Sequence, residues 1–243
     1  MSQHGVNTSE LSGKVVVITG ASRGIGAACA RELAAEGAQL ALLARSAGPL
    51  EDLAAECRGL GGAALPVACD VTQSASVSAA IEQVMSHYGR IDFLVNNAGV
   101  GYYKRFMELT EAQWDEMYSI NLKGAFLVLK SVIPHMVNAR SGMVIAVSSI
   151  RGFETIATTA GYSATKFGLN GMHMALAQDM KEYGVRVSIV CPGGVRTSFL
   201  GISPEDKDPN WLSAEDVARA VVHCAKTPYP ASIAQLNLVP ARI

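Results

Sequence analysis

The stretch VVVITGASRGIG, residues 15–26, contains two overlapping glycine motifs. Gly20 to Gly24 matches G-x-S-x-G, the turn between a strand and a helix that presents the nucleophilic serine of many hydrolases. Gly20, Gly24 and Gly26 also form a glycine-rich turn of the kind that binds phosphate. Both interpretations place an apolar strand before the turn and a helix after it, because such a turn needs glycines whatever it presents.

The position of this stretch in the chain favours the phosphate interpretation. A hydrolase serine needs a second oxyanion N–H from an earlier strand-helix loop, and only about a dozen residues precede this strand. The late histidine of a triad would be His223, which lies within a helical pattern. As a phosphate loop, Gly20 permits the tight turn, Gly24 lets the backbone approach a pyrophosphate, and Gly26 lets the helix pack close to its strand. The helix N-terminus then faces the anion.

The rest of the chain repeats this pattern of strand and helix. Segments with helical spacing of apolar residues separate the apolar runs, and Thr110-x-x-Gln113 and Ser213-x-x-Asp216 resemble capping boxes. Strands with few polar positions, joined by helices, predict an α/β fold: a Rossmann-type, doubly wound, seven-stranded parallel sheet with helices on both faces. We expect a single domain over residues 1–243, with residues 1–12 as a flexible tail. The expected strands are 14–19, 39–44, 63–68, 91–96, 142–147, 186–190 and 234–239.

Composition narrows the possible partners. The net charge of −1 and the absence of a basic run argue against nucleic acid. No apolar run approaches the ~20 residues that cross a bilayer, so we expect no membrane span. The polar N-terminus does not resemble a secretory signal, and five widely spaced cysteines without a C-x-x-C pair favour the cytoplasm. The histidines have no metal-ligand spacing, so no metal is expected.

Further motifs fall where the predicted strands end. They are Thr19-Gly20-Ala21-Ser22-Arg23-Gly24-Ile25-Gly26, Asp70-Val71, Asn96-Asn97-Ala98-Gly99, Asn121, Ser148-Ser149, Tyr162-x-x-x-Lys166 and Pro192-Gly193 with Val195 and Thr197. In this order, and over nearly the whole chain, they resemble the short-chain dehydrogenase/reductase family. The resemblance implies an oxidoreductase that transfers hydride between a nicotinamide cofactor and a carbonyl or secondary alcohol.

Tyr162 and Lys166 are the expected centre of this chemistry. Four residues apart, they share one face of a helix. A tyrosine that exchanges a proton near neutrality needs its pKa lowered by roughly 2 to 3 units from ~10. A lysine at ~4 Å, helped by an oxidised nicotinamide, is a sufficient cause. The resemblance implies that Tyr162 is the general acid/base, that Lys166 also holds the ribose, and that Ser149, rather than its neighbour Ser148, binds the substrate oxygen.

Asn121 has two interpretations. The resemblance implies that it helps to hold a water-linked proton path from Lys166, and the alternative is an asparagine that caps a backbone kink. The resemblance also implies that Asp70, with the Val71 backbone beside it, accepts from the adenine amino group, while Asn96 and Gly99 stabilise the turn around the adenosine and Asn97 bridges strands.

The end of the second predicted strand indicates which dinucleotide binds. A site for NAD needs a carboxylate there, but the chain reads Leu42-Leu43-Ala44-Arg45-Ser46. Arg45 and Arg23 can clamp a 2′-phosphate, with Ser22 or Ser46 as a neutral donor, so we expect NADP(H); the alternative is two solvated arginines. The residues expected to contact the cofactor, from the glycine turn, the arginines and the resemblance together, are Gly20, Ser22, Arg23, Gly24, Ile25, Gly26, Arg45, Ser46, Asp70, Val71, Asn97, Ala98, Gly99, Tyr162, Lys166, Pro192, Gly193, Val195 and Thr197.

The substrate is expected to contact three segments: Val100–Met107, Ile150–Ala157 and Ser198–Asn210. Tyr102, Arg151, Phe153 and Phe199 are the candidates within them. A different class of function is a nucleotide-sensing regulator without catalysis; the Ser149, Tyr162, Lys166 set, which such sensors commonly lack, favours the enzyme. Residues 124–129 and 167–177 are more apolar than one buried helix face requires, which predicts a homodimer or homotetramer.

Overall fold

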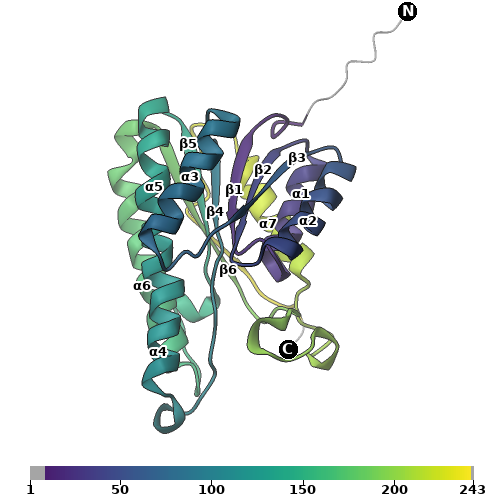
Figure 1. Ribbon diagram of the computed structural model, residues 1–243. Helices are drawn as coiled ribbons and strands as arrows, with labels where there is room; N and C mark the ends of the chain where they lie inside the picture. Colours follow the sequence, from purple (N-terminus) through teal and green to yellow (C-terminus); the bar gives the residue numbers. More distant parts are fainter. Residues whose placement is uncertain (1–8, 242–243) are drawn as a thin grey trace, which may run out of the picture.

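A computed structural model describes residues 9–241 and shows one sheet of seven parallel strands in the order β3-β2-β1-β4-β5-β6-β7. This confirms the predicted doubly wound fold (Figure 1). The strand order reverses between β1 and β4, and the glycine turn follows β1 at that switch point. The strands are β1 (Val15–Thr19), β2 (Gln39–Ala44), β3 (Ala63–Ala68), β4 (Phe93–Asn96), β5 (Gly142–Val147), β6 (Val185–Pro192) and β7 (Gln235–Leu238).

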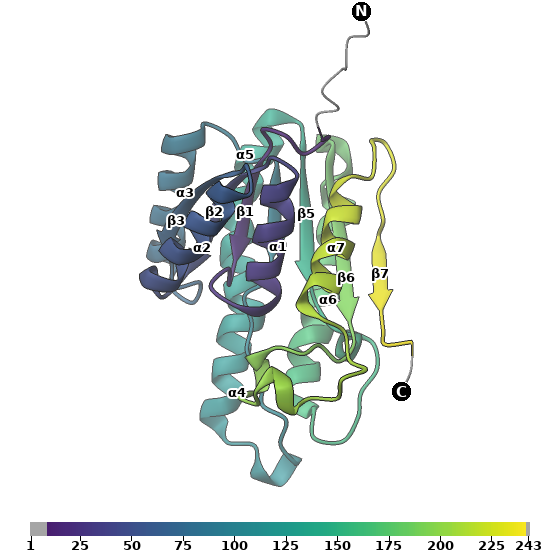
Figure 2. The same cartoon turned by 90° about the vertical axis from the view of Figure 1, so that its right-hand side faces the viewer.

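Helices cover both faces of the sheet. Successive residues of a strand point to opposite faces, and in the central strands the residues on both faces are apolar. In β1, Val16 and Ile18 join the core beneath α1, α2 and α7, whereas Val15 and Val17 join the core beneath α3, α5 and α6. Figures 1 and 2 show the two helical layers. The helices are α1 (Gly24–Ala35), α2 (Ala47–Gly59), α3 (Ser74–Tyr88), α4 (Glu111–Met117), α5 (Ala125–Ala139), α6 (Ala160–Asp179) and α7 (Ala214–Ala225).

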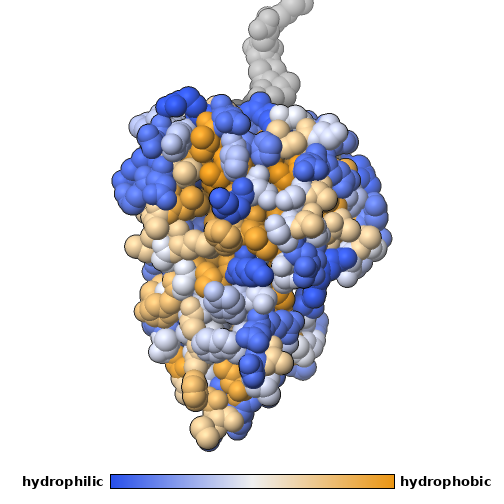
Figure 3. Space-filling view, turned by 60° about the vertical axis from the view of Figure 1, so that its left-hand side comes forward, coloured by the Kyte–Doolittle hydropathy of each residue, from blue (hydrophilic) through white to orange (hydrophobic). Residues whose placement is uncertain are grey.

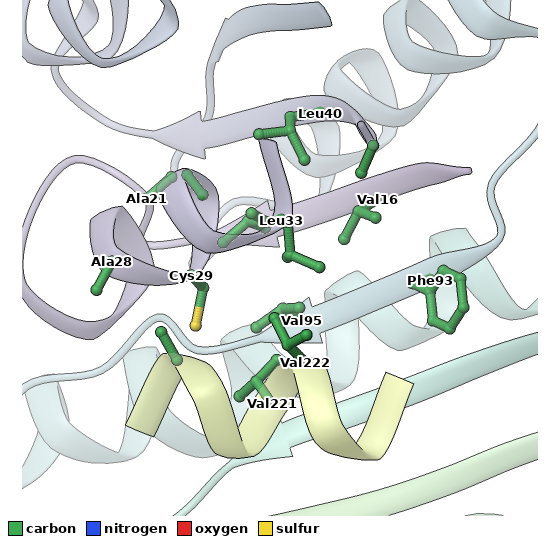
Figure 4. Close-up of a cluster of buried hydrophobic side chains, with 14 of the residues drawn as sticks. Val16, Ala21, Ala28, Cys29, Leu33, Leu40, Phe93, Val95, Val221 and Val222 are labelled. Carbon is green, nitrogen blue, oxygen red and sulfur yellow. The ribbon is translucent and has the colours of Figure 1, made fainter. Parts of the chain in front are cut away.

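The first helix is held close to the sheet by small residues. Most of its buried positions are glycine, alanine or cysteine, so its backbone approaches both the strands and α7. Figure 4 shows side chains of α1 and α7, among them Cys29, Leu33 and Val221, which meet over Val16 and Val95 of the sheet. The position of the α1 N-terminus above the sheet is therefore fixed by core packing.

The chain before β1 differs from the prediction. Residues 9–12 are not a flexible tail, because Leu11 is buried in the core and the Ser9 hydroxyl donates to the carboxylate of Glu36. An apolar residue that buries its side chain orders the backbone around it. Residues 1–8 of the predicted tail lie outside the described residues.

One long helix runs from Glu111 to Ala139 through α4, a wider π-helical turn η2 (Tyr118–Gly124) and α5. It begins with the predicted capping box of Thr110 and Gln113. By length and composition alone, this helix could cross a membrane. Many of its apolar side chains, among them Val128 and Val132, pack in the core against the sheet.

Candidate active site

A cavity of about 1180 Å³ lies beyond the carboxyl ends of the strands. Of the residues predicted for catalysis and cofactor binding, Gly26 and Asn121 do not line it. The other predicted residues are brought together there from loops far apart in the sequence. They are Gly20, Ser22, Arg23, Gly24, Ile25, Arg45, Ser46, Asp70, Val71, Asn97, Ala98, Gly99, Ser149, Tyr162, Lys166, Pro192, Gly193, Val195 and Thr197.

The glycine turn at the centre of the cavity has no room for side chains. Gly20 has φ +63° and a Cβ on it would lie 2.9 Å from the Cα of Ala98. Gly26 packs the first turn of α1 so tightly that a Cβ would lie 2.2 Å from the carbonyl oxygen of Gly20. The residue before α1, Arg23, provides no side-chain cap, so the first N–H groups of the helix are free to bind an anion.

The loop after β4 is braced against this turn. The Thr19 hydroxyl accepts from the backbone N–H groups of Asn97 (2.9 Å) and Ala98 (3.0 Å). The Asn97 amide in turn donates to the carbonyl oxygens of Thr19 (2.9 Å) and Gly20 (3.3 Å). Asn97 therefore bridges β1 and β4 at the switch point, which keeps the two loops at a fixed separation.

A second cluster lies where β2 and β3 end. The Asp70 carboxylate accepts from the backbone N–H and the hydroxyl of Thr72, at 2.9 and 2.8 Å. These bonds, with a smaller effect from the charge of Arg45, hold the pKa of Asp70 below its usual value. Arg45 follows β2 directly and lines the cavity with Arg23 and Ser46, while the last residue of β2 is Ala44. The strand end thus presents a cation where an NAD site would present a carboxylate.

At the other end of the cavity, α6 presents Tyr162 and Lys166 on one buried face. They are 5% and 4% exposed, and the Lys166 Nζ lies 5.7 Å from the centre of the Tyr162 ring. The Lys166 ammonium donates to the carbonyl oxygen of Val147 at 3.1 Å, which ties α6 to the end of β5. Ser149, two residues further along, lines the cavity beside them.

Burial shifts the pKa of both residues of this pair. Burial raises the pKa of Tyr162 above its usual value; the nearby Ser149 hydroxyl and the charge of Arg151 oppose this only in part. Burial also lowers the pKa of Lys166, to about 8. The prediction counted the charges of Lys166 and of an oxidised nicotinamide, and it omitted the cost of removing the two side chains from water.

The two adjacent serines have different partners. The Ser148 hydroxyl donates to the Asn170 side chain at 2.5 Å, and Asn170 donates in turn to the carbonyl oxygen of Gly152 at 3.0 Å. The Ser149 hydroxyl accepts from the backbone N–H of Arg151 at 3.1 Å. Asn170 thus fixes the short helix η3 (Ile150–Gly152) that holds Ser149. Sequence reasoning missed Asn170; its spacing of one helical turn from Lys166 was the available signal.

Asn121 lies in the wide turn η2 and is almost fully buried. Its side chain accepts from the N–H of Val100 and donates to the Val100 carbonyl oxygen, both at 2.8 Å. It also donates to the Thr165 hydroxyl at 3.0 Å. Asn121 therefore fastens the loop after β4 to α6, next to Lys166.

Aromatic rings surround Tyr162. The rings of Tyr103 and Phe199 lie 5.5 and 5.7 Å from it, centre to centre. Arg151 and Phe199 line the cavity as expected, but Phe153 does not, and Tyr103 replaces the predicted Tyr102. The Tyr102 hydroxyl instead donates to Glu116 of α4 at 2.5 Å. Neighbouring tyrosines in an irregular loop offer no periodicity that shows which one faces inward.

Lys207 and Trp211 are further lining residues that sequence reasoning did not single out. Lys207 is buried, and its Nζ lies 5.8 Å from the centre of the Trp211 ring. Trp211 packs on Gly194, where a Cβ would lie 2.6 Å from the indole. These contacts close the cavity on the side of β6.

Comparison with known proteins agrees with this geometry. Residues 14–208 match the family model described as short chain dehydrogenase. The 3-oxoacyl-[acyl-carrier-protein] reductase of Thermotoga maritima is 36% identical over 209 residues, which cover 86% of this chain and 85% of that protein.

Two solved structures are similar over their whole length. The alcohol dehydrogenase of Thermococcus sibiricus, complexed with 5-hydroxy-NADP, has a TM-score of 0.89 at 34% identity, covering 95% of this chain and 97% of that chain. A metagenomic short-chain oxidoreductase in complex with NADP has a TM-score of 0.83 at 37% identity, covering 97% and 100%. The fold, the cavity and these matches agree: the chain belongs to the short-chain dehydrogenase family of oxidoreductases.

Proposed function

We propose that the protein is an NADP(H)-dependent oxidoreductase that interconverts a carbonyl compound and a secondary alcohol. One observation carries the proposal: Ser149, Tyr162 and Lys166 lie at one end of a single cavity, and the anion-binding glycine turn lies along the same cavity. A dinucleotide is long enough to occupy both parts at once. Tyr162 and Lys166 would line the end of the cavity that takes the nicotinamide.

The residues of the cavity fit such a cofactor. The free N–H groups at the start of α1 suit a pyrophosphate, and a Cβ on Gly24 would already reach the side chain of Thr197 at 3.4 Å. Asp70 can accept from the adenine amino group, because both Thr72 bonds go to one of its carboxylate oxygens. When bound, the cofactor supplies or accepts the hydride.

Arg23 and Arg45 favour NADP(H) over NAD(H). Both line the cavity near the end of β2, and neither forms an ion pair within residues 9–241. Guanidinium groups bind phosphate through paired N–H donors, so the two arginines suit a 2′-phosphate. The relatives that were solved with NADP or 5-hydroxy-NADP support this choice.

The chain's own groups suit Tyr162 to donate a proton to the carbonyl oxygen. Tyr162 is protonated at neutral pH, since the usual pKa of a tyrosine is ~10 and burial raises it further, so it can donate in the direction of carbonyl reduction. Ser149 donates a hydrogen bond to the same oxygen and fixes its position. Lys166 stabilises the negative charge that forms on the tyrosine oxygen, and Asn121 holds the backbone beside this proton path.

An absorbance screen tests the proposal. NADPH oxidation is measured against a panel of ketones, aldehydes, keto acids and keto esters, in parallel with NADH. Turnover of at least one member, with NADPH preferred, is the expected result. Binding of NADPH without turnover of any member would favour a nucleotide-sensing regulator instead.

We also propose that the chain forms a homodimer or homotetramer through α5 and α6. Figure 3 shows apolar surface over this side of the molecule. Phe126, Phe167 and Met174 are 44–59% exposed there, beside a shallow groove between the two helices. Light scattering tests this proposal, and a monomer at micromolar concentration would contradict it.

A further inference from the structure

Arg151 is held at a fixed place in the cavity. It lies in η3 directly after β5, and its backbone N–H donates to the Ser149 hydroxyl. The same short helix is anchored by Gly152, whose carbonyl accepts from Asn170 and where a Cβ would lie 2.4 Å from the Asn170 amide. The backbone of Arg151 is thereby fixed relative to the group that binds the substrate oxygen.

Arg151 carries a charge that has no partner in the part of the chain that the structure describes. Within residues 9–241 its guanidinium forms no ion pair and no hydrogen bond, although it is partly buried and lines the cavity. Of the other charged groups that line the cavity, Glu154 and Asp208 form no ion pair with it, and Lys207 lies over Trp211. A partly desolvated cation with unused donors suits an anion that enters with the ligand.

Arg151 lines the same cavity as Ser149 and Tyr162. Its charge acts to lower the pKa of both Tyr162 and Tyr103, so it is within electrostatic reach of the two hydroxyls. The surrounding wall is aromatic, from Tyr103 and Phe199. An anion bound to Arg151 would therefore lie near a carbonyl held by Tyr162 and Ser149, against apolar rings.

We propose that the substrate is a carbonyl compound with an anionic group, a carboxylate or a phosphate, close to its carbonyl, and that Arg151 binds this group. The inference rests on the proposed oxidoreductase function and adds the class of substrate. The carbonyl accepts a hydride from the reduced cofactor and a proton from Tyr162, and the anionic group is unchanged in the reaction.

The test compares matched substrates. With NADPH, kcat/KM is measured for a short keto acid and its methyl ester, and for a keto phosphate and its dephosphorylated alcohol. The wild-type protein is expected to prefer the anionic member of at least one pair, and the pair with the larger ratio identifies the group. Arg151→Gln should lower that ratio about 10- to 100-fold, as expected for a lost bond between charged groups.

Two variants control for other causes. Arg151→Lys keeps the charge and the backbone N–H, so it should retain part of the preference. Arg58→Gln removes one charge from an exposed residue of α2 that does not line the cavity, and it should leave the ratio unchanged.

The outcomes separate the two proposals. Turnover of the neutral members with no preference for the anionic ones in the wild-type protein would overturn the role of Arg151 alone. An equal ratio in the wild-type protein and in Arg151→Gln would do the same. Failure to turn over any member with either cofactor would overturn the oxidoreductase proposal itself. The wild-type ratios test the preference for an anionic substrate even if Arg151→Gln does not fold.

Discussion

Replacement of Arg45 by aspartate should reverse the preference between NADPH and NADH. Arg45 is exposed and lies at the end of β2, where its charge already reaches Asp70. The substitution removes hydrogen bonds between charged groups of about 1.5–3 kcal/mol. It also adds repulsion of about 1 kcal/mol between the new carboxylate and the 2′-phosphate, taken at ~5 Å in water because the site is exposed.

These effects together predict a loss of about 10²- to 10³-fold in kcat/KM for NADPH. NADH should gain a few-fold, because the carboxylate can accept from the ribose 2′-hydroxyl. The assay is steady-state kinetics with both cofactors at a fixed carbonyl substrate. Arg58→Asp, an equal change of charge at an exposed residue of α2 that does not line the cavity, is the control. An unchanged ratio of the two kcat/KM values in Arg45→Asp would refute the role given to this arginine.

Three further predictions follow from the packing and the protonation of the site. Gly26→Ala should lower Tm by roughly 2–10 °C in thermal denaturation, since overpacking costs about 1–3 kcal/mol; Gly48→Ala, where no atom lies within 4 Å of the new Cβ, should leave Tm unchanged or raise it. The kcat/KM for carbonyl reduction should fall as pH rises through about 8, because Lys166 is charged only below its pKa. A flat profile between about pH 6 and 10 would contradict this. Asn170→Ala should lower both Tm and kcat, because it removes the acceptor of the Ser148 hydroxyl and the donor to the Gly152 carbonyl in η3. Thermal denaturation and steady-state kinetics of the same preparation measure the two effects. An unchanged kcat would show that the position of η3 does not depend on Asn170.

The fold could be predicted because the strands between the two edges of the sheet, β2, β1, β4, β5 and β6, are buried on both faces. Such strands are continuous apolar runs, and the helices between them are long enough to show their periodicity. The ends of the strands were predicted less accurately. The strand β4 begins at Phe93, two residues later than predicted, and β6 extends to Pro192, two residues beyond its predicted end. Leu11 shows the same limit, because a single apolar residue in a polar segment has no periodicity to indicate that it is buried.

The site could be predicted as far as its residues follow directly after strands. Parallel strands bring their carboxyl ends to one edge, so the glycine turn, Asp70 and Ser149 had to meet there. Tyr103, Asn170 and Lys207 could not be found in this way, because their orientation depends on tertiary packing. The direction of the pKa shift of Tyr162 could not be predicted either, since it depends on how deeply the side chain is buried.

The role proposed for Tyr162 is to transfer the proton in an NADP(H)-linked reaction. Tyr162→Phe removes one oxygen atom and keeps the ring that packs between Tyr103 and Phe199. The measurement is the rate of NADPH oxidation with the best substrate of the carbonyl panel, alongside a fluorescence titration of NADPH binding. If Tyr162 transfers the proton, Tyr162→Phe should lower kcat about 10²- to 10⁴-fold and should still bind NADPH. A variant that keeps the wild-type kcat would contradict it.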